Sequence, residues 1–168
     1  FVTMGKFTHD LRRPETAINL GIIYGMCAFG LTRTSDLTLA EAEDFLEDYY
    51  QTFPGVKRFL DQIRVRAAQD GYVETLLGRR RYFPGLKTQQ NQMLRNREER
   101  EAINAPIQGT AADIMKIAML RVDEALEKSG LSCRMLLQVH DELVLECPQE
   151  ETDQVIQIVS QVMQQAYQ

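Results

Sequence analysis

Residues 133–146 place two short apolar runs around a polar turn, and this pattern limits the fold more than any other stretch of the chain. The runs are CRMLLQV and LVLE, and His140, Asp141 and Glu142 lie between them. Short apolar runs bounded by a polar turn are typical of two antiparallel strands joined by a tight hairpin. The sequence therefore predicts a β-hairpin whose turn carries a histidine and two carboxylates.

Helical patterns dominate much of the remaining chain. The apolar spacing from Pro14 to about Leu31 predicts one helix with proline in its first turn. Thr38 and Glu41 have the capping-box spacing that begins a second helix, and Gly71 suits the end of a third.

Residues 72–83 alternate in polarity and predict a second, smaller hairpin. The composition from about residue 90 to 127 is helical, but Pro106 and Gly109 predict a break or kink there, so that two helices meet. A closing amphipathic helix follows Pro148. Helices that surround hairpins predict an α+β fold.

Composition limits the class of protein. The chain has 168 residues, with 44% hydrophobic and 26% charged side chains, and no apolar stretch approaches the ~20 residues of a membrane helix. The first residues show no secretory signal, and they begin with Phe1 rather than methionine, which suggests a truncated chain. We expect a soluble protein with no membrane partner.

The three cysteines lack CxxC spacing and are odd in number, which argues against a disulfide framework and against a zinc site. We therefore expect a reducing compartment and a cytoplasmic location.

The net charge is −5, but arginines cluster at residues 79–81 and at residues 95, 97 and 100. Local basic clusters of this kind can bind phosphates, although solvated helix faces look the same in sequence.

Three groups of residues could carry chemistry. Asp141 and Glu142 form a carboxylate pair of the kind that holds Mg²⁺, although Asp141 also suits a turn for backbone reasons alone. One turn cannot saturate the ion, so a further carboxylate is needed. His140 could act as a base, donate to a phosphate or simply pack.

The second and third groups follow helical spacing. Arg12, Thr16, Leu20 and Tyr24 recur every four residues, and an arginine near a helix N-terminus favours an anion, while the tyrosine could stack on a base. Arg100, Asn104 and Gln108 repeat the spacing and suit sugar–phosphate and minor-groove contacts. An amphipathic helix and a polar helix stripe remain the simpler interpretations.

These groups together resemble the family A DNA polymerases, over nearly the whole chain from Arg12 onward. RRPETAINLGIIYG is similar to the fingers-helix motif of that family, and VHDE is similar to its palm motif C. REEREAINAPIQGTAAD is similar to the helices that grip primer–template DNA, and GYVETLLGRRRYFP to the sequence between fingers and palm.

The resemblance implies template-directed transfer of deoxynucleotides to a primer 3′-hydroxyl with two Mg²⁺ ions, in DNA replication or repair. It implies that Arg12 meets the nucleotide's terminal phosphates and that Tyr24 stacks near the new base pair, with Thr16 and Leu20 at the nucleotide positions between them. It implies that Asp141 is the metal-binding aspartate, that Glu142 is a neighbouring acid of lesser role and that His140 lies near the primer end. It also implies that the DNA is contacted by Arg100, Asn104 and Gln108.

The resemblance also implies an atypical stretch at 1–11, a fingers subdomain at 12–88 and a palm portion at 89–168.

The chain departs from the family pattern in three respects. Thr16 replaces the family lysine and Leu20 replaces a phenylalanine. The motif A aspartate would lie before Arg12, outside this chain, so a missing N-terminal part of the same polymerase is an expected partner. A non-catalytic nucleic-acid-binding module and a relative of single-subunit RNA polymerases are the alternatives.

Overall fold

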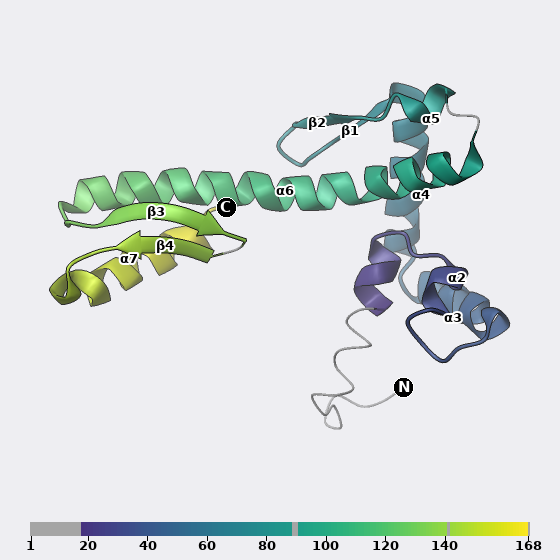
Figure 1. Cartoon of the computed structure of the whole chain (residues 1–168), viewed down its shortest axis with the longest axis horizontal. Coiled ribbons are helices and arrows are strands. Elements are labelled where there is room, and N and C mark those ends of the chain that lie inside the picture. Colours follow the sequence, from purple (N-terminus) through teal and green to yellow (C-terminus); the bar gives the residue numbers. More distant parts are fainter. Residues whose placement is uncertain (1–17, 89–90, 141, 168) are drawn as a thin grey trace. The chain divides into compact units, whose positions relative to one another are not determined.

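The computed structural model describes residues 18–88, 91–140 and 142–167 (Figure 1). The chain divides into two compact units, and the boundary falls between Ile107 and Gln108. Helices dominate both units, and each unit contributes a two-stranded antiparallel hairpin, which confirms the predicted α+β class. No helix in these described ranges is long and apolar enough to cross a membrane. The predicted fingers and palm boundaries stay a prediction.

The first unit combines short and long helices with one small hairpin. Its elements are helical residues 18–23, α2 (Ala28–Leu31), α3 (Leu39–Thr52), α4 (Pro54–Asp70), β1 (Tyr72–Glu74), β2 (Arg80–Tyr82), α5 (Gly85–Thr88) and the first part of α6 (Gln92–Ser129). Strands β1 and β2 pair antiparallel, with Tyr72 opposite Tyr82. The predicted small hairpin is therefore confirmed.

The predicted helix boundaries around α3 and α4 are confirmed. The Thr38 hydroxyl accepts a hydrogen bond from the Glu41 backbone N–H at 3.4 Å, and the Glu41 carboxylate accepts one from the Thr38 N–H at 2.9 Å. This reciprocal pair satisfies backbone donors that have no partner inside the helix. Helix α4 ends at Gly71, whose φ of 81° places it in the left-handed region.

The single helix predicted from Pro14 to Leu31 is wrong over its second half. Helical residues 18–23 are followed by a turn at Gly25, whose φ is 79°, before α2 begins. The Gly25 N–H donates to the Ile22 carbonyl at 2.9 Å, and the Met26 N–H donates to the Gly21 carbonyl at 2.8 Å. This pair of bonds is the Schellman motif, which ends a helix where glycine follows it.

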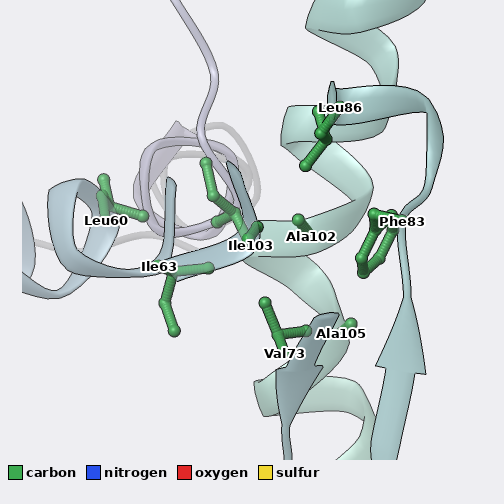
Figure 2. Close-up of a cluster of buried hydrophobic side chains, with 9 residues drawn as sticks. Leu60, Ile63, Val73, Phe83, Leu86, Ala102, Ile103 and Ala105 are labelled. Carbon is green, nitrogen blue, oxygen red and sulfur yellow. The ribbon is translucent and has the colours of Figure 1, made fainter. Parts of the chain in front are cut away.

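One apolar core holds the first unit together, and Figure 2 shows its side chains. Helix α4, strand β1, the segment that follows β2 and helix α6 all contribute to it. Its buried members are Leu60, Ile63, Ala67, Val73, Phe83, Leu86, Ala102, Ile103 and Ala105. The core therefore fixes the N-terminal half of α6 against α4 and the small hairpin.

The break predicted near residues 104–109 is also wrong. Helix α6 runs without interruption from Gln92 to Ser129, with Pro106 inside it. Proline removes one backbone hydrogen bond and crowds the carbonyl four residues earlier. Ala102, Ile103 and Ala105 are buried in the first core, and this packing holds the helical path through the proline.

The second unit packs a hairpin against two helices. It contains the remainder of α6, strands β3 (Arg134–Val139) and β4 (Glu142–Glu146), a short 3₁₀ helix (Gln149–Glu151) and α7 (Thr152–Gln164). Strands β3 and β4 pair antiparallel, as predicted. Val122, Leu126 and Val155 form the buried centre, and Met135, Leu143 and Leu145 from the hairpin pack against it.

Strand β3 contains a bulge, and the outer face of the hairpin is apolar. Met135 pairs with Leu145 and Leu137 pairs with Val144, so Leu136 is the extra residue. The side chains of Leu137, Val139 and Val144 are 49%, 44% and 38% exposed. Strands that are apolar on both faces are typical of sheets that are covered on both sides.

The capping box at α3 predicts a stability loss that depends on pH. Thr38→Ala should cost about 1 kcal/mol of unfolding free energy at neutral pH. The Thr38 hydroxyl donates to the Glu41 carboxylate and lowers its pKa below the usual 4.5. The ionised Glu41 carboxylate therefore stabilises the fold at pH values above 4.5. This contribution is lost as the pH falls through the lowered pKa of the folded state. Urea unfolding should therefore show a smaller effect of the substitution at about pH 3.

Thr52→Ala is the matched control, because the Thr52 hydroxyl donates to the Asp48 carbonyl inside the same helix at 2.9 Å and caps nothing. Its loss should be smaller and should not change with pH. An equal loss for both variants would contradict the cap.

The turn at Gly25 predicts a second, larger cost. An added Cβ in Gly25→Ala would lie 3.0 Å from Ile103 Cδ1, and the left-handed backbone alone costs roughly 1–2 kcal/mol for a residue with a side chain. Gly78→Ala shares the backbone conformation, with a φ of 81°, but its Cβ would meet nothing within 4 Å. Chemical unfolding should show Gly25→Ala to be the more destabilising of the two. Equal losses would mean that the contact with Ile103 adjusts freely.

Candidate nucleotide and nucleic-acid interface

The end of the first helix presents two of the predicted nucleotide-binding side chains. Leu20 and Tyr24 lie one turn apart, and the Tyr24 N–H donates to the Leu20 carbonyl at 2.9 Å. The Leu20 side chain is 45% exposed, and Tyr24 is half-buried. Arg12 and Thr16 lie outside the described residues, so their predicted places on this helix face stay predictions.

The neighbouring residue Asn19 ties this helix end to α3. The Tyr49 hydroxyl donates a hydrogen bond to Asn19 Oδ1 at 2.7 Å. Partial burial raises the pKa of Tyr49 above 10.0, so the hydroxyl keeps its proton and remains a donor over the physiological range. The bond links the helix that carries Leu20 and Tyr24 to α3.

A cavity lies between Gly25, the residue after Tyr24, and helix α6. Its volume is about 220 Å³, and both the turn that follows Tyr24 and the helix α6 line it. The lining residues are Gly25, Cys27, Arg64, Asn96, Glu99, Arg100 and Ile103. The missing side chain of Gly25 faces Ile103 and the Arg100 stem, so glycine keeps this space open. The structure therefore brings the tyrosine turn and Arg100 together within the first unit.

Arg100 supplies a positive charge at this cavity. The adjacent Glu99 is engaged by Arg95 at 3.3 Å, and Arg97 pairs with Glu101 at 3.1 Å. Arg100 forms no ion pair with any residue in the described ranges, and it is exposed. A guanidinium of this kind beside an open cavity is suited to a phosphate or another anion, because its fork of N–H donors matches that geometry.

Arg100, Asn104 and Gln108 are carried by one continuous helix. Arg100 and Gln108 are exposed, whereas Asn104 is half-buried and its Oδ1 is buried without a hydrogen-bond partner among the described residues. A buried amide oxygen that lacks a partner costs free energy, and native structures usually retain such groups for a reason. Asn104 and Arg100 belong to the first unit and Gln108 begins the second.

The cavity contains residues that the sequence analysis missed. Asn96 lies one helical turn before Arg100, so extending the four-residue spacing backwards would have found it. Arg64 comes from α4 and pairs with Asp61 at 3.1 Å, and no local pattern distinguishes it from other helix-surface arginines.

The second unit carries the predicted catalytic turn. Val139 pairs with Glu142, which leaves a two-residue connection that begins at His140. His140 has a φ of 54°, and the Gln138 side-chain amide donates to its carbonyl at 2.6 Å. Two-residue hairpins favour positive φ because the resulting turn matches the twist of the strands. Both His140 and Glu142 are exposed.

Asp141, the predicted metal ligand, lies outside the described residues. Among the residues that are described, no group of three histidine, cysteine, aspartate or glutamate side chains comes together in a metal-binding cluster. Glu142 offers one exposed carboxylate at the strand end, where an oxygen-preferring cation could use it together with a neighbouring carboxylate. The donor chemistry at the turn fits part of a magnesium site and needs further oxygen ligands.

Two known proteins are similar to this chain in sequence. DNA polymerase I of Bacillus caldotenax is 46% identical over 165 residues, covering 98% of this chain and 19% of that protein. DNA polymerase I of Geobacillus stearothermophilus is 48% identical over 159 residues, covering 95% of this chain and 18% of the relative. The chain therefore spans about a fifth of the length of these curated relatives.

A solved structure has the same fold. The POL domain of Pol1 from M. smegmatis, in complex with DNA primer-template and dNTP, matches 99% of this chain and 29% of that chain, with a TM-score of 0.92 and 43% identity. The sequence model of DNA polymerase family A matches residues 1–168. The chain belongs to DNA polymerase family A.

Proposed function

We propose that this chain forms the fingers and part of the palm of a template-directed DNA polymerase, which transfers deoxynucleotides to a primer 3′-hydroxyl. The observation that carries the proposal is the cavity where Gly25, next to Tyr24, meets Arg100 of α6. A guanidinium beside an open space is suited to a phosphate, and the ring of Tyr24, one residue before Gly25, is proposed to stack on a base. The solved relative in complex with DNA primer-template and dNTP supports the same two classes of partner.

The nucleotide side of the site rests on the first helix. Leu20 and Tyr24 provide an apolar and aromatic face, and Arg12 is proposed to bind the terminal phosphates from the N-terminal end of the same helix. Thr16 stands between them where a lysine would add positive charge. Charge stabilisation is the main contribution to phosphoryl transfer, so the proposal implies that other cations compensate for Thr16.

The DNA side rests on α6. Arg100 and Gln108 are exposed, and Asn104 adds an amide between them on the same helical spacing. Arginine neutralises backbone phosphates, while amides donate to the minor-groove acceptors that all base pairs share. We propose that these three residues hold the primer–template near its growing end.

The chemical step is proposed to take place at the β3–β4 turn. Asp141 and Glu142 would hold Mg²⁺, which, when bound, stabilises charge on the attacking and leaving oxygens. The strands on either side of the turn are anchored, because Met135, Leu143 and Leu145 pack against the core of the second unit. His140, at the positive-φ position, is proposed to lie at the primer end.

Another part of the polymerase is proposed to complete this site. The relatives are about five times longer than this chain, and the outer face of the hairpin exposes Leu137, Val139 and Val144. An apolar strand face of this kind is stabilised when further strands or helices cover it. The segment that covers it is proposed to bring the second metal-binding carboxylate. A cytoplasmic location remains part of the proposal.

Primer extension tests the proposed chemistry. Asp141→Ala in the product of the complete gene should lower the extension rate by roughly 10²-fold or more, because a charge-stabilising group at the reacting phosphate is lost. The same variant should bind primer–template DNA normally. Glu146→Ala is the control, since Glu146 pairs with Arg134 at 3.0 Å at the other end of β4. Undiminished extension by Asp141→Ala would instead favour a module that binds nucleic acid without catalysis.

DNA binding tests the role of Arg100. Arg100→Ala should weaken binding to primer–template DNA and should reduce the slope of log K against log salt by about one, the value for one lost phosphate contact. Arg97→Ala is the matched control on the same helix, because Arg97 is already paired with Glu101. Fluorescence anisotropy at several salt concentrations measures both quantities. Equal effects of the two substitutions would contradict a specific contact by Arg100.

A further inference from the structure

Two cysteines lie at the open end of the β3–β4 hairpin. Cys133 directly precedes β3 and Cys147 directly follows β4. The outermost pair of the ladder is Arg134 with Glu146, so the next positions outward on the two strands are Cys133 and Cys147. Opposite residues of antiparallel strands have Cα atoms about 4.5–5.5 Å apart, which lies within the disulfide range of about 4.4–6.8 Å.

The surroundings of the two thiols agree with this placement. Both cysteines are half-buried, and both pack against the core formed by Val122, Leu126 and Val155. Burial raises the pKa of the Cys133 thiol, and the nearby Cys147 thiol contributes to the rise, which is an effect only of close neighbours. The third cysteine, Cys27, is exposed and belongs to the first unit.

The open end of the hairpin is held in register while both thiols are reduced. The Arg134 guanidinium donates to the Glu146 carboxylate at 3.0 Å across the strands, directly beside the two cysteines. Cys147 Sγ lies 3.9 Å from the Thr152 hydroxyl at the start of α7, which limits its movement. Two thiols that are held opposite each other form a disulfide with little loss of conformational freedom.

We propose that Cys133 and Cys147 are a redox modification site, at which a small-molecule disulfide such as oxidised glutathione converts the two thiols into one intrachain disulfide. One cysteine thiolate attacks the small disulfide and releases one small thiol. The second cysteine then attacks the mixed disulfide and releases the other. The two protein thiols lose two electrons and two protons, and the small disulfide gains them as two thiols.

The bond closes the hairpin at the end opposite the His140 turn. It constrains residues 133–147 in the unfolded chain, and this constraint raises the stability of the folded unit. Burial raises the pKa of the Cys133 thiol, so less of this thiol is thiolate at neutral pH and its exchange accelerates as the pH rises.

The test uses glutathione redox buffers with the product of the complete gene, in native buffer and in urea. Peptide mapping should find the Cys133–Cys147 disulfide, lighter by two hydrogen atoms, whereas the exposed Cys27 should form at most a mixed disulfide with glutathione. The effective concentration of the two thiols should be at least about tenfold higher in native buffer than in urea, because the fold holds the strands together. The oxidised chain should also unfold at a higher urea concentration, and dithiothreitol should reverse this shift.

Single substitutions supply the controls. Cys27→Ser should form the disulfide as the parent chain does. Cys133→Ser and Cys147→Ser should each stop at a mixed disulfide with glutathione on the remaining cysteine of the pair. Equal effective concentrations in native buffer and urea would overturn the proposal. So would stable glutathione adducts on both cysteines of the folded parent chain.

Discussion

Both apolar cores take side chains from helix α6, so each unit depends on the packing of its own stretch of that helix. Proline inside a helix costs about 3 kcal/mol or more, and burial of one large apolar side chain contributes about 1.5–3 kcal/mol. Ile103, with Ala102 and Ala105 beside it, is buried next to Pro106, so packing is of the right size to offset the proline. The same packing holds the part of the helix that carries Arg100 and Asn104, so the core of the first unit also sets the spacing of these two proposed DNA contacts.

Local patterns predicted most of the elements but not where packing overrules them. The capping box at Thr38, the left-handed end at Gly71 and both hairpins were recognisable because their signals lie within a few residues. The long first helix was wrong, since its apolar spacing continues past Gly25 although the backbone turns there. The prediction of a break in α6 was wrong because the local signal at Pro106 is overruled by packing. The residues that hold the helix through Pro106 do so by contacts with α4 and β1, which no window of sequence contains.

The candidate site was predictable as separate groups rather than as an assembly. Four-residue spacing was enough to group Leu20 with Tyr24, and Arg100 with Asn104 and Gln108, whereas their roles came from the family resemblance and stay predictions. Of these residues, Arg100 lines the cavity beside the turn that follows Tyr24, and this placement depends on the close approach of Gly25 to Ile103, which is a tertiary property. Arg64 had no signal because its place in the cavity is set by the packing of α4. The roles of Arg12, Thr16 and Asp141 stay predictions.

The bulge at Leu136 has a consequence that follows from counting alone. Nine residues separate Met135 from its partner Leu145, and cross-strand pairing uses residues two at a time. A two-residue turn leaves seven of these nine residues for the strands, and seven residues cannot all form pairs. One residue is therefore left out of the ladder. The chain could have enlarged the turn to three residues, but it accommodates the odd residue inside β3 instead. The irregularity is thereby moved into the strand, and the connection at His140 keeps the shortest length that a hairpin favours.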